Sequence, residues 1–167
     1  MRALGREHDY LVPALPHRPV EAIALLRGLI EQHPGTALIG SSLGGYYATW
    51  LAEHCAHAAL RVALVNPAVR PYALLGGYLG TQKNMYTGVE YELTAQHVEE
   101  LIALEVTAIT PARYFLVTRT GDDVLDYRDA VGKYRGARQW VIPGGDHGFG
   151  DFGNYLDTVL EFCGVLP

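Results

Sequence analysis

The chain has 167 residues, a length that fits one domain and leaves no room for a second of ordinary size. Hydrophobic residues make up 49% and charged residues 19%, a balance typical of a globular protein that argues against disorder. The net charge of −5 and the lack of any basic run argue against a nucleic-acid-binding protein. No apolar stretch reaches the roughly 18 residues of a transmembrane helix, and residues 1–9 lack a signal-peptide core, so a cytoplasmic protein without membrane insertion is expected.

The first third of the chain alternates short apolar strands with helices. Tyr10 to Val12 reads as a brief strand, and a helix is predicted from Pro19 to about His33 because Pro is favoured at the first helical position. A buried strand, Ala37 to Ile39, leads into a second helix over about 44–57. The next buried strand, Val62 to Val65, is stopped by Asn-Pro.

The segment 71–111 departs from this alternation of strands and helices. It contains Gly-rich turns, several tyrosines and one predicted helix, Thr94 to Glu105, with Thr94 as its cap. An insertion of this length between two sheet strands indicates a lid over a site. The alternative is an ordinary crossover with a long loop.

Regular alternation returns in the last third, with strands at Tyr114–Thr118 and Gln139–Ile142 and helices near Asp126–Tyr134 and Asp151–Cys163. Continuous apolar strands separated by helices are typical of a parallel sheet that is covered on both faces. The sequence therefore predicts a single α/β domain over residues 1–167. Its expected architecture is a three-layer sandwich with a mostly parallel sheet of about five strands and a lid-like insertion.

A nucleophile motif lies between the second strand and the second helix. Gly40-Ser41-Ser42-Leu43-Gly44 matches G-x-S-x-G, in which the central serine occupies a strained strand-to-helix turn and glycines avoid collisions with the backbone. The helix that follows favours the negative charge that develops during acyl transfer. Ser42 is the candidate nucleophile, and the alternative is a tight turn without chemistry.

A serine hydroxyl needs an adjacent base that is itself oriented by a third group. Of seven histidines, His147 lies in a Gly-rich loop after the last strand, in the chain order Ser, acid, His. The orienting acid should follow the preceding strand, where Asp122 and Asp123 stand, and Asp122 is preferred with Asp123 as the alternative acid. Either aspartate could instead only cap a turn, and Asp126 and Asp146 are weaker candidates.

The sequence resembles the small bacterial YqiA-like esterases of the α/β-hydrolase superfamily over nearly its whole length. The runs that carry the resemblance are GSSLGGYYATW from Gly40, NPAVRP from Asn66, YTG from Tyr86, TGDDVLDY from Thr120 and GGDHGF from Gly144. The resemblance implies an esterase acting on simple acyl esters and acyl-CoA thioesters, without metal or organic cofactor. It assigns the triad to Ser42, Asp122 and His147.

One departure from the family is expected to matter. Members open with a strand that ends in a His-Gly-Phe type loop, and this chain begins at what resembles the following helix, as a truncated chain or gene model would. The strand at Ala37 to Ile39 would then face a gap with unpaired backbone groups. One oxyanion donor would be the Leu43 amide, while the second, normally supplied by the absent loop, would be lost at a cost of about 10²–10³ in rate.

The predicted function is a carboxylic ester hydrolase, either an esterase or a thioesterase, whose partner is a small-molecule acyl substrate. Two alternatives stay open: an acyltransferase that uses the same triad, and a weak or silent hydrolase-fold binding module that lacks the oxyanion loop. A dinucleotide-binding domain is disfavoured because residues 40–45 lack the G-x-G-x-x-G spacing.

Overall fold

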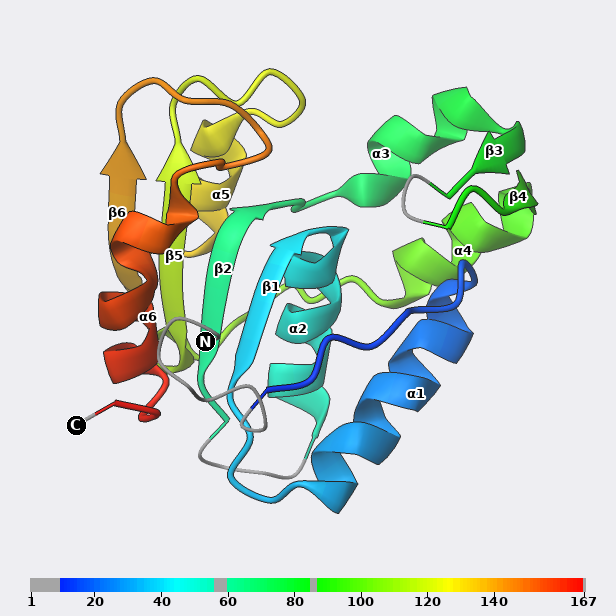
Figure 1. The fold of residues 1–167 in the computed structure, drawn as a ribbon. Coiled ribbons are helices and arrows are strands. Elements are labelled where there is room, and N and C mark those ends of the chain that lie inside the picture. The colour runs from blue at the N-terminus through cyan, green and yellow to red at the C-terminus, as the bar shows by residue number, and fades with distance from the viewer. Residues whose placement is uncertain (1–9, 56–59, 85–86, 167) are drawn as a thin grey trace.

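The computed structural model describes residues 10–55, 60–84 and 87–166, and its centre is a parallel sheet of four strands (Figure 1). The strand order is β1-β2-β5-β6, and all three neighbouring pairs are parallel. The strands are β1 (Leu38–Ser42), β2 (Val62–Pro67), β5 (Tyr114–Arg119) and β6 (Arg138–Ile142). Because the strands are parallel, their carboxyl ends share one edge of the sheet, where α/β folds place their ligand sites.

The two central strands, β2 and β5, are buried along their entire length. Alternate residues on each strand face opposite sides of the sheet and enter separate core clusters. On β2, Val62 and Leu64 belong to one cluster, whereas Ala63 and Val65 belong to another. Burial on both faces explains why these strands are continuously apolar in sequence.

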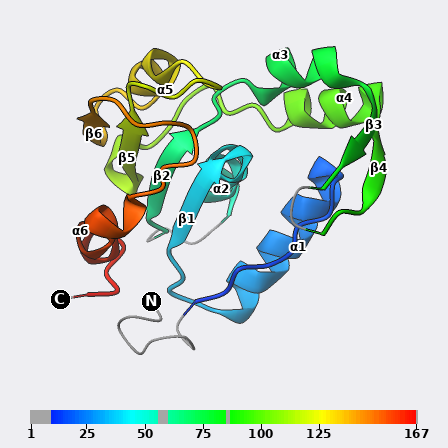
Figure 2. The same ribbon diagram turned by 45° about the horizontal axis from the view of Figure 1, so that its top comes forward.

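Helices cover both faces of the sheet (Figure 2). On one face lie α2 (Leu43–His54) and α5 (Tyr127–Lys133), which contribute Ala48, Ala52 and Ala130 to the core, joined by Tyr134 directly after α5. On the other face lies α6 (Leu156–Phe162), which contributes Val159 and follows the short η5 (Phe152–Tyr155). The three-layer α/β architecture predicted from the sequence is therefore confirmed.

The segment 71–111 forms a small unit beside the carboxyl end of β1 (Figure 1). In chain order it contains α3 (Pro71–Leu75), η3 (Gly76–Tyr78), β3 (Gly80–Lys83), β4 (Glu90–Leu93) and α4 (Ala95–Ala103), and η4 (Pro111–Arg113) begins at its last residue. The strands β3 and β4 pair as an antiparallel hairpin. Thr94 caps α4 through a reciprocal capping box with His97, as the choice of Thr94 for the helix start predicted.

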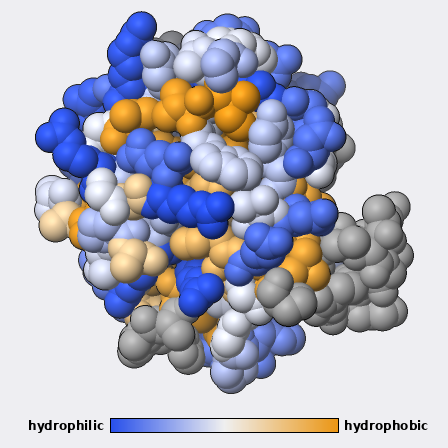
Figure 3. Space-filling view, turned by 90° about the vertical axis from the view of Figure 1, so that its left-hand side faces the viewer, coloured by the Kyte–Doolittle hydropathy of each residue, from blue (hydrophilic) through white to orange (hydrophobic). Residues whose placement is uncertain are grey.

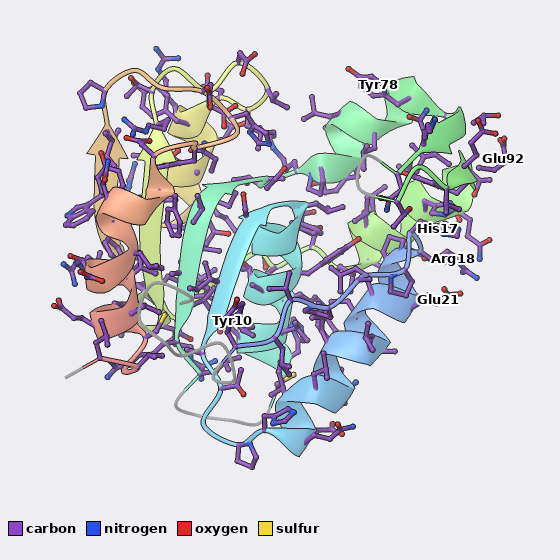
Figure 4. All side chains as sticks on the ribbon, in the orientation of Figure 1. Tyr10, His17, Arg18, Glu21, Tyr78 and Glu92 are labelled. Carbon is purple, nitrogen blue, oxygen red and sulfur yellow. The ribbon has the colours of Figure 1, made fainter. Side chains whose placement is uncertain are left out.

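This unit is joined to α1 (Pro19–Gln32), whose first turn lies next to α4. The carboxylate of Glu100 pairs with Arg18 and accepts the Val20 amide at 3.3 Å. His17 stacks on His97, with ring centroids 5.4 Å apart. Figure 4 shows His17 and Arg18 at this end of α1, near the strand that carries Glu92.

Most predicted elements lie within a few residues of their observed bounds, and two expectations are corrected. Tyr10 to Val12 forms no strand, so the main sheet has four strands rather than about five. The side chains of Leu11 and Val12 are 60% and 84% exposed, so this short run buries too little surface to be held in a sheet. The β3–β4 hairpin was not expected, and Ala56 and His57, the predicted end of the second helix, lie outside the described residues.

The two edge strands are only partly covered. On β6, Val141 is 40% exposed, and the face on the side of β6 and α6 carries hydrophilic residues with several apolar groups among them (Figure 3). On β1, Ile39 is 46% exposed, and within the described ranges β1 pairs with β2 alone. None of the helices that the structure describes is long and apolar enough to cross a membrane.

Candidate active site

Ser42 stands at the turn between β1 and α2 with an unusual backbone. Its φ of 50° and ψ of −123° lie in a region that residues with a side chain rarely adopt. A nucleophile elbow requires this strained conformation because it projects the serine oxygen above the carboxyl edge of the sheet. The turn that the motif predicted is therefore present at Ser42.

The glycines that make this turn possible differ in part from those in the motif. A Cβ atom on Gly40 would lie 2.5 Å from the carbonyl oxygen of Gly44, and one on Gly45 would lie 2.6 Å from Cβ of Pro67. A Cβ atom on Gly44 would meet nothing within 4 Å. Close approach of the backbone therefore requires Gly40 and Gly45, whereas the motif had pointed to Gly40 and Gly44.

The turn that follows β5, residues 120–125, contains a buried carboxylate and is called the acid turn below. The side chain of Asp122 is 1% exposed, and its Oδ1 accepts the amides of Val124 and Leu125, both at 2.9 Å. Its other oxygen, Oδ2, lies 2.8 Å from Nδ1 of His147. Asp122 thus both shapes its own turn and contacts the imidazole, which combines the two roles that the sequence left as alternatives.

A chain of two hydrogen bonds connects the three predicted triad residues. Nδ1 of His147 is bound to Asp122, and Nε2 lies 3.1 Å from Oγ of Ser42. The His147 side chain is 25% exposed, so one part of the ring meets solvent. A buried acid, an imidazole and a serine hydroxyl in this order match the geometry of a nucleophile, its base and the group that orients the base.

The other aspartates lie elsewhere. Asp123 is exposed, and no hydrogen bond joins it to His147. The side chain of Asp126 accepts the Arg128 amide at the start of α5, which is the role of a helix N-cap. Asp146 accepts the Phe149 amide within residues 143–149, the loop that carries His147 and is called the histidine loop below. Of the candidate acids, the structure brings only Asp122 to the imidazole.

The amide of Leu43, the predicted oxyanion donor, is the first of α2. The first amides of a helix have no partner within the helix, and they lie at its positive end. The amide is adjacent to Ser42 in the chain, at the N-terminus of α2. Within the described ranges, no three His, Cys, Asp or Glu side chains gather in a way that could hold a metal ion.

Two buried polar residues near the histidine loop were not identified from the sequence. Asn66 is the residue before the last of β2, has a φ of 39° and is 1% exposed, and its Nδ2 donates to the carbonyl oxygens of Asp146 and His147. Arg119 ends β5, is 7% exposed and pairs with Asp151. A polar or charged residue at or next to the end of a continuously apolar strand is the sequence feature that could have identified both residues.

Arg119 packs beneath the loop of the candidate base. Its guanidinium carbon lies 4.6 Å from the ring centroid of Phe149, and its Nη1 donates to the Pro143 carbonyl at 3.4 Å. Its hydrogen bond and charge hold the pKa of Asp151 below its ordinary range. A Cβ on Gly145 would lie 2.7 Å from Cδ of Arg119, so the loop passes close over this side chain.

The acid turn and the histidine loop are also joined directly. Gly121 donates its amide to the Gly144 carbonyl at 3.1 Å, and Thr120 Oγ1 accepts the Gly144 amide at 2.9 Å. A Cβ on Gly121 would lie 2.4 Å from the carbonyl oxygen of Gly145. The two loops therefore fit together only because Gly121 has no side chain.

Comparison with known families gives a match over residues 1–164 to the model described as "Uncharacterised protein family (UPF0227)". The chain belongs to this family. Membership in UPF0227 agrees with the resemblance to YqiA-like proteins that the sequence motifs indicated.

Solved structures similar to this UPF0227 chain share its fold at low sequence identity. Est1E from Butyrivibrio proteoclasticus has a TM-score of 0.65 and 15% identity, with 87% of this chain and 71% of Est1E covered. A monoacylglycerol lipase from Paleococcus ferrophilus has a TM-score of 0.62 and 16% identity, with coverage of 87% and 75%. The esterase domain of a Rhodothermus marinus protein has a TM-score of 0.59 and 17% identity, with coverage of 84% and 67%. These likenesses establish the α/β-hydrolase fold.

Proposed function

We propose that this UPF0227 protein is a serine hydrolase that cleaves carboxylic esters or acyl thioesters through an acyl-enzyme. Ser42 is the nucleophile, His147 the base and Asp122 the group that orients the base. The observation that carries the proposal is the pair of hydrogen bonds at His147, 2.8 Å to Asp122 and 3.1 Å to Ser42. The strained backbone of Ser42 supports it, because such strain persists only where the surrounding structure enforces it.

In the first half-reaction, Oγ of Ser42 bonds to the acyl carbon while its proton passes to Nε2 of His147. Asp122 stabilises the imidazolium and keeps Nδ1 protonated, so that Nε2 of the neutral ring faces the serine. The bond to the alcohol or thiol then breaks, and His147 gives its proton to the leaving group. The acyl group remains on Ser42.

In the second half-reaction, water replaces the leaving group. His147 takes a proton from the water as its oxygen bonds to the acyl carbon, and the bond to Ser42 breaks as the serine regains a proton. The carboxylic acid leaves and the starting state returns. In both halves the Leu43 amide donates to the oxyanion at the positive end of α2.

The substrate class rests on the chemistry of the site and on the related folds. An activated serine attacks acyl carbons, and a proton supplied by His147 suits an alcohol or thiol leaving group. Neighbours with this fold are described as esterases and a monoacylglycerol lipase, and Est1E has been seen with ferulic acid bound. Within a single domain over residues 1–167, the segment 71–111 would act as a lid beside Ser42.

The test compares hydrolysis of p-nitrophenyl butyrate and of butyryl-CoA by the wild type, Ser42→Ala and Ser41→Ala. Ser41 and Ser42 are the only serines in the chain, so Ser41→Ala is a matched control. The proposal expects Ser42→Ala to lose turnover of both compounds and Ser41→Ala to keep it. Equal activity of Ser42→Ala and the wild type would contradict the proposal.

Two further outcomes separate the alternatives. An acyl-enzyme that forms but releases its acyl group only to an added alcohol or amine would indicate an acyltransferase. A folded wild type that forms no acyl-enzyme would indicate a silent binding module. Intact-protein mass after mixing with the ester distinguishes the three outcomes.

A further inference from the structure

Asn66 lies between β1, which ends at the candidate nucleophile, and β5, which leads into the turn of the candidate acid. It is the fifth residue of β2, which pairs with β1 on one side and β5 on the other. Two residues later, the Ala68 amide donates to the Ser42 carbonyl at 3.0 Å. Asn66 therefore lies on a fully buried central strand, at the carboxyl edge of the sheet where the site lies.

The orientation of this side chain is fixed by its partners. Oδ1 accepts the backbone amide of Arg119 at 2.8 Å and the hydroxyl of Thr118 at 3.2 Å. A backbone amide can only donate and a carbonyl can only accept, so the oxygen of Asn66 must face β5 and its nitrogen must face the histidine loop. In the reverse orientation, the amide nitrogen of Asn66 would face the N–H of Arg119, and its oxygen would face the carbonyl oxygens of Asp146 and His147.

The two hydrogens of Nδ2 are both used on the histidine loop. They reach the carbonyl oxygens of Asp146 and His147, each at 3.1 Å. This loop belongs to no helix or strand, and Gly144, Gly145 and Phe149 have positive φ angles. Regular secondary structure therefore does not fix the backbone of His147, and Asn66 supplies a buried anchor for it.

The positive φ angle alone does not explain why position 66 is an asparagine. A φ of 39° favours Asn, Asp or Gly over other residues. Glycine would leave the Arg119 amide and two loop carbonyls without this partner, and aspartate would place a carboxylate oxygen against two carbonyl oxygens. Only a carboxamide supplies an acceptor toward β5 and two donors toward the loop.

We infer that Asn66 is a positioning residue for the proposed hydrolase, one that holds the backbone of His147 so that Nε2 meets Oγ of Ser42. The inference rests on the proposed function for its kinetic consequence, while the loop anchoring is a property of the fold. The hydrogen bonds of the Asn66 side chain reach neither Ser42 nor the imidazole ring. It acts through the carbonyls of Asp146 and His147.

The kinetic test uses Asn66→Asp, which keeps the size of the side chain and its tolerance of positive φ but removes both donors. A displacement of the base by about 1 Å costs on the order of 10² in rate. We therefore expect kcat for p-nitrophenyl butyrate, per folded molecule, to fall by about 10²-fold with little change in KM. The folded fraction is taken from thermal melts at the assay pH.

Glu53→Gln is the control for a general loss of stability. Glu53 lies on α2, its side chain is 14% exposed, and it accepts hydrogen bonds from Thr110 and Tyr114. Its replacement should lower Tm without changing kcat per folded molecule. If Asn66→Asp also lowers only Tm, Asn66 is a structural residue and the inference is overturned.

A second readout separates this inference from the proposed function. In protein with 15N-labelled histidine, the proton shared between His147 Nδ1 and Asp122 should give an NMR signal in the wild type that weakens or shifts in Asn66→Asp. An unchanged signal would overturn the positioning role whether or not the protein turns over esters. A shifted signal in a protein that never reacts with an ester would support the positioning role and contradict the proposed function.

Discussion

Nε2 of His147 lies 3.1 Å from Oγ of Ser42, although 105 positions separate the two residues in the chain. The contact follows from the topology of the sheet. Ser42 ends β1, and His147 follows β6, the strand at the opposite edge. All four strands are parallel, so both residues emerge at the same end of the sheet, and the loop after β6 returns across it toward Ser42.

The first prediction concerns the choice of acid. Asp122→Asn keeps the shape of the turn but removes the carboxylate that holds the Nδ1 proton, so kcat should fall by about 10³–10⁴-fold with KM nearly unchanged. Asp123→Asn changes an exposed neighbour and should stay close to wild-type activity. Steady-state kinetics on p-nitrophenyl butyrate measure both. A larger loss of kcat in the Asp123 variant would indicate that Asp123, the alternative acid, orients His147.

The second prediction separates the glycines of the serine turn. Gly40→Ala places a methyl group 2.5 Å from a backbone oxygen and should destabilise the protein by about 1–3 kcal/mol. Gly44→Ala meets nothing within 4 Å, and in a helix alanine is favoured over glycine by up to about 1 kcal/mol. Thermal melts should therefore show a lower Tm for Gly40→Ala only. Equal losses in the two variants would argue against the close approach at Gly40.

The third prediction uses a matched pair in the histidine loop. Gly144 and Gly145 have φ angles of 68° and 74°, so alanine at either position carries a similar strain of about 1–2 kcal/mol. Only the methyl group at 145 also collides with the buried side chain of Arg119. Gly145→Ala should therefore lose more stability and more ester hydrolysis than Gly144→Ala. The reverse order would mean that Arg119 does not support this loop.

The fourth prediction concerns the acid stability of the fold. Burial alone would raise the pKa of Glu53, but hydrogen bonds from Tyr114 and Thr110 outweigh burial and hold the pKa below its ordinary value of 4.5. A lowered folded-state pKa contributes stability that is fully present above the unfolded-state value. That stability is lost as the pH falls through the folded-state value.

The variant Glu53→Gln should therefore have a lower Tm than the wild type at about pH 6, and the difference should shrink below about pH 4 as the carboxyl group is protonated. Differential scanning calorimetry at a series of pH values measures this. A difference in Tm that stays constant with pH would show that the charge of Glu53 contributes no stability.

The strands and helices of the main domain could be predicted because their signals are local. Val62 to Val65 and Tyr114 to Thr118 are continuously apolar, and burial on both faces of a parallel sheet gives that pattern. The run at Tyr10 to Val12 has a similar composition, but Leu11 and Val12 are exposed, and burial cannot be predicted from three residues. The β3–β4 hairpin was missed because polar residues such as Thr81 and Glu92 dominate its strands.

The candidate site could likewise be predicted from the sequence only in part. Ser42, Asp122 and His147 could be found because each follows a recognisable strand in a fixed chain order. Asn66 and Arg119 could not be placed, because their partners come from β5 and from the histidine loop, which only the folded sheet brings together. The need for glycine at Gly45, on α2, likewise arises from Pro67, a residue on β2.

The roles of Ser42 and His147 are tested together by the rate at which a fluorophosphonate probe labels the protein, followed by peptide mapping. We expect one adduct, on Ser42, no adduct on Ser42→Ala, and labelling of His147→Ala that is slower by at least about 10²-fold, because the general base is lost. An adduct on another residue, or equal labelling rates for the wild type and His147→Ala, would contradict these roles.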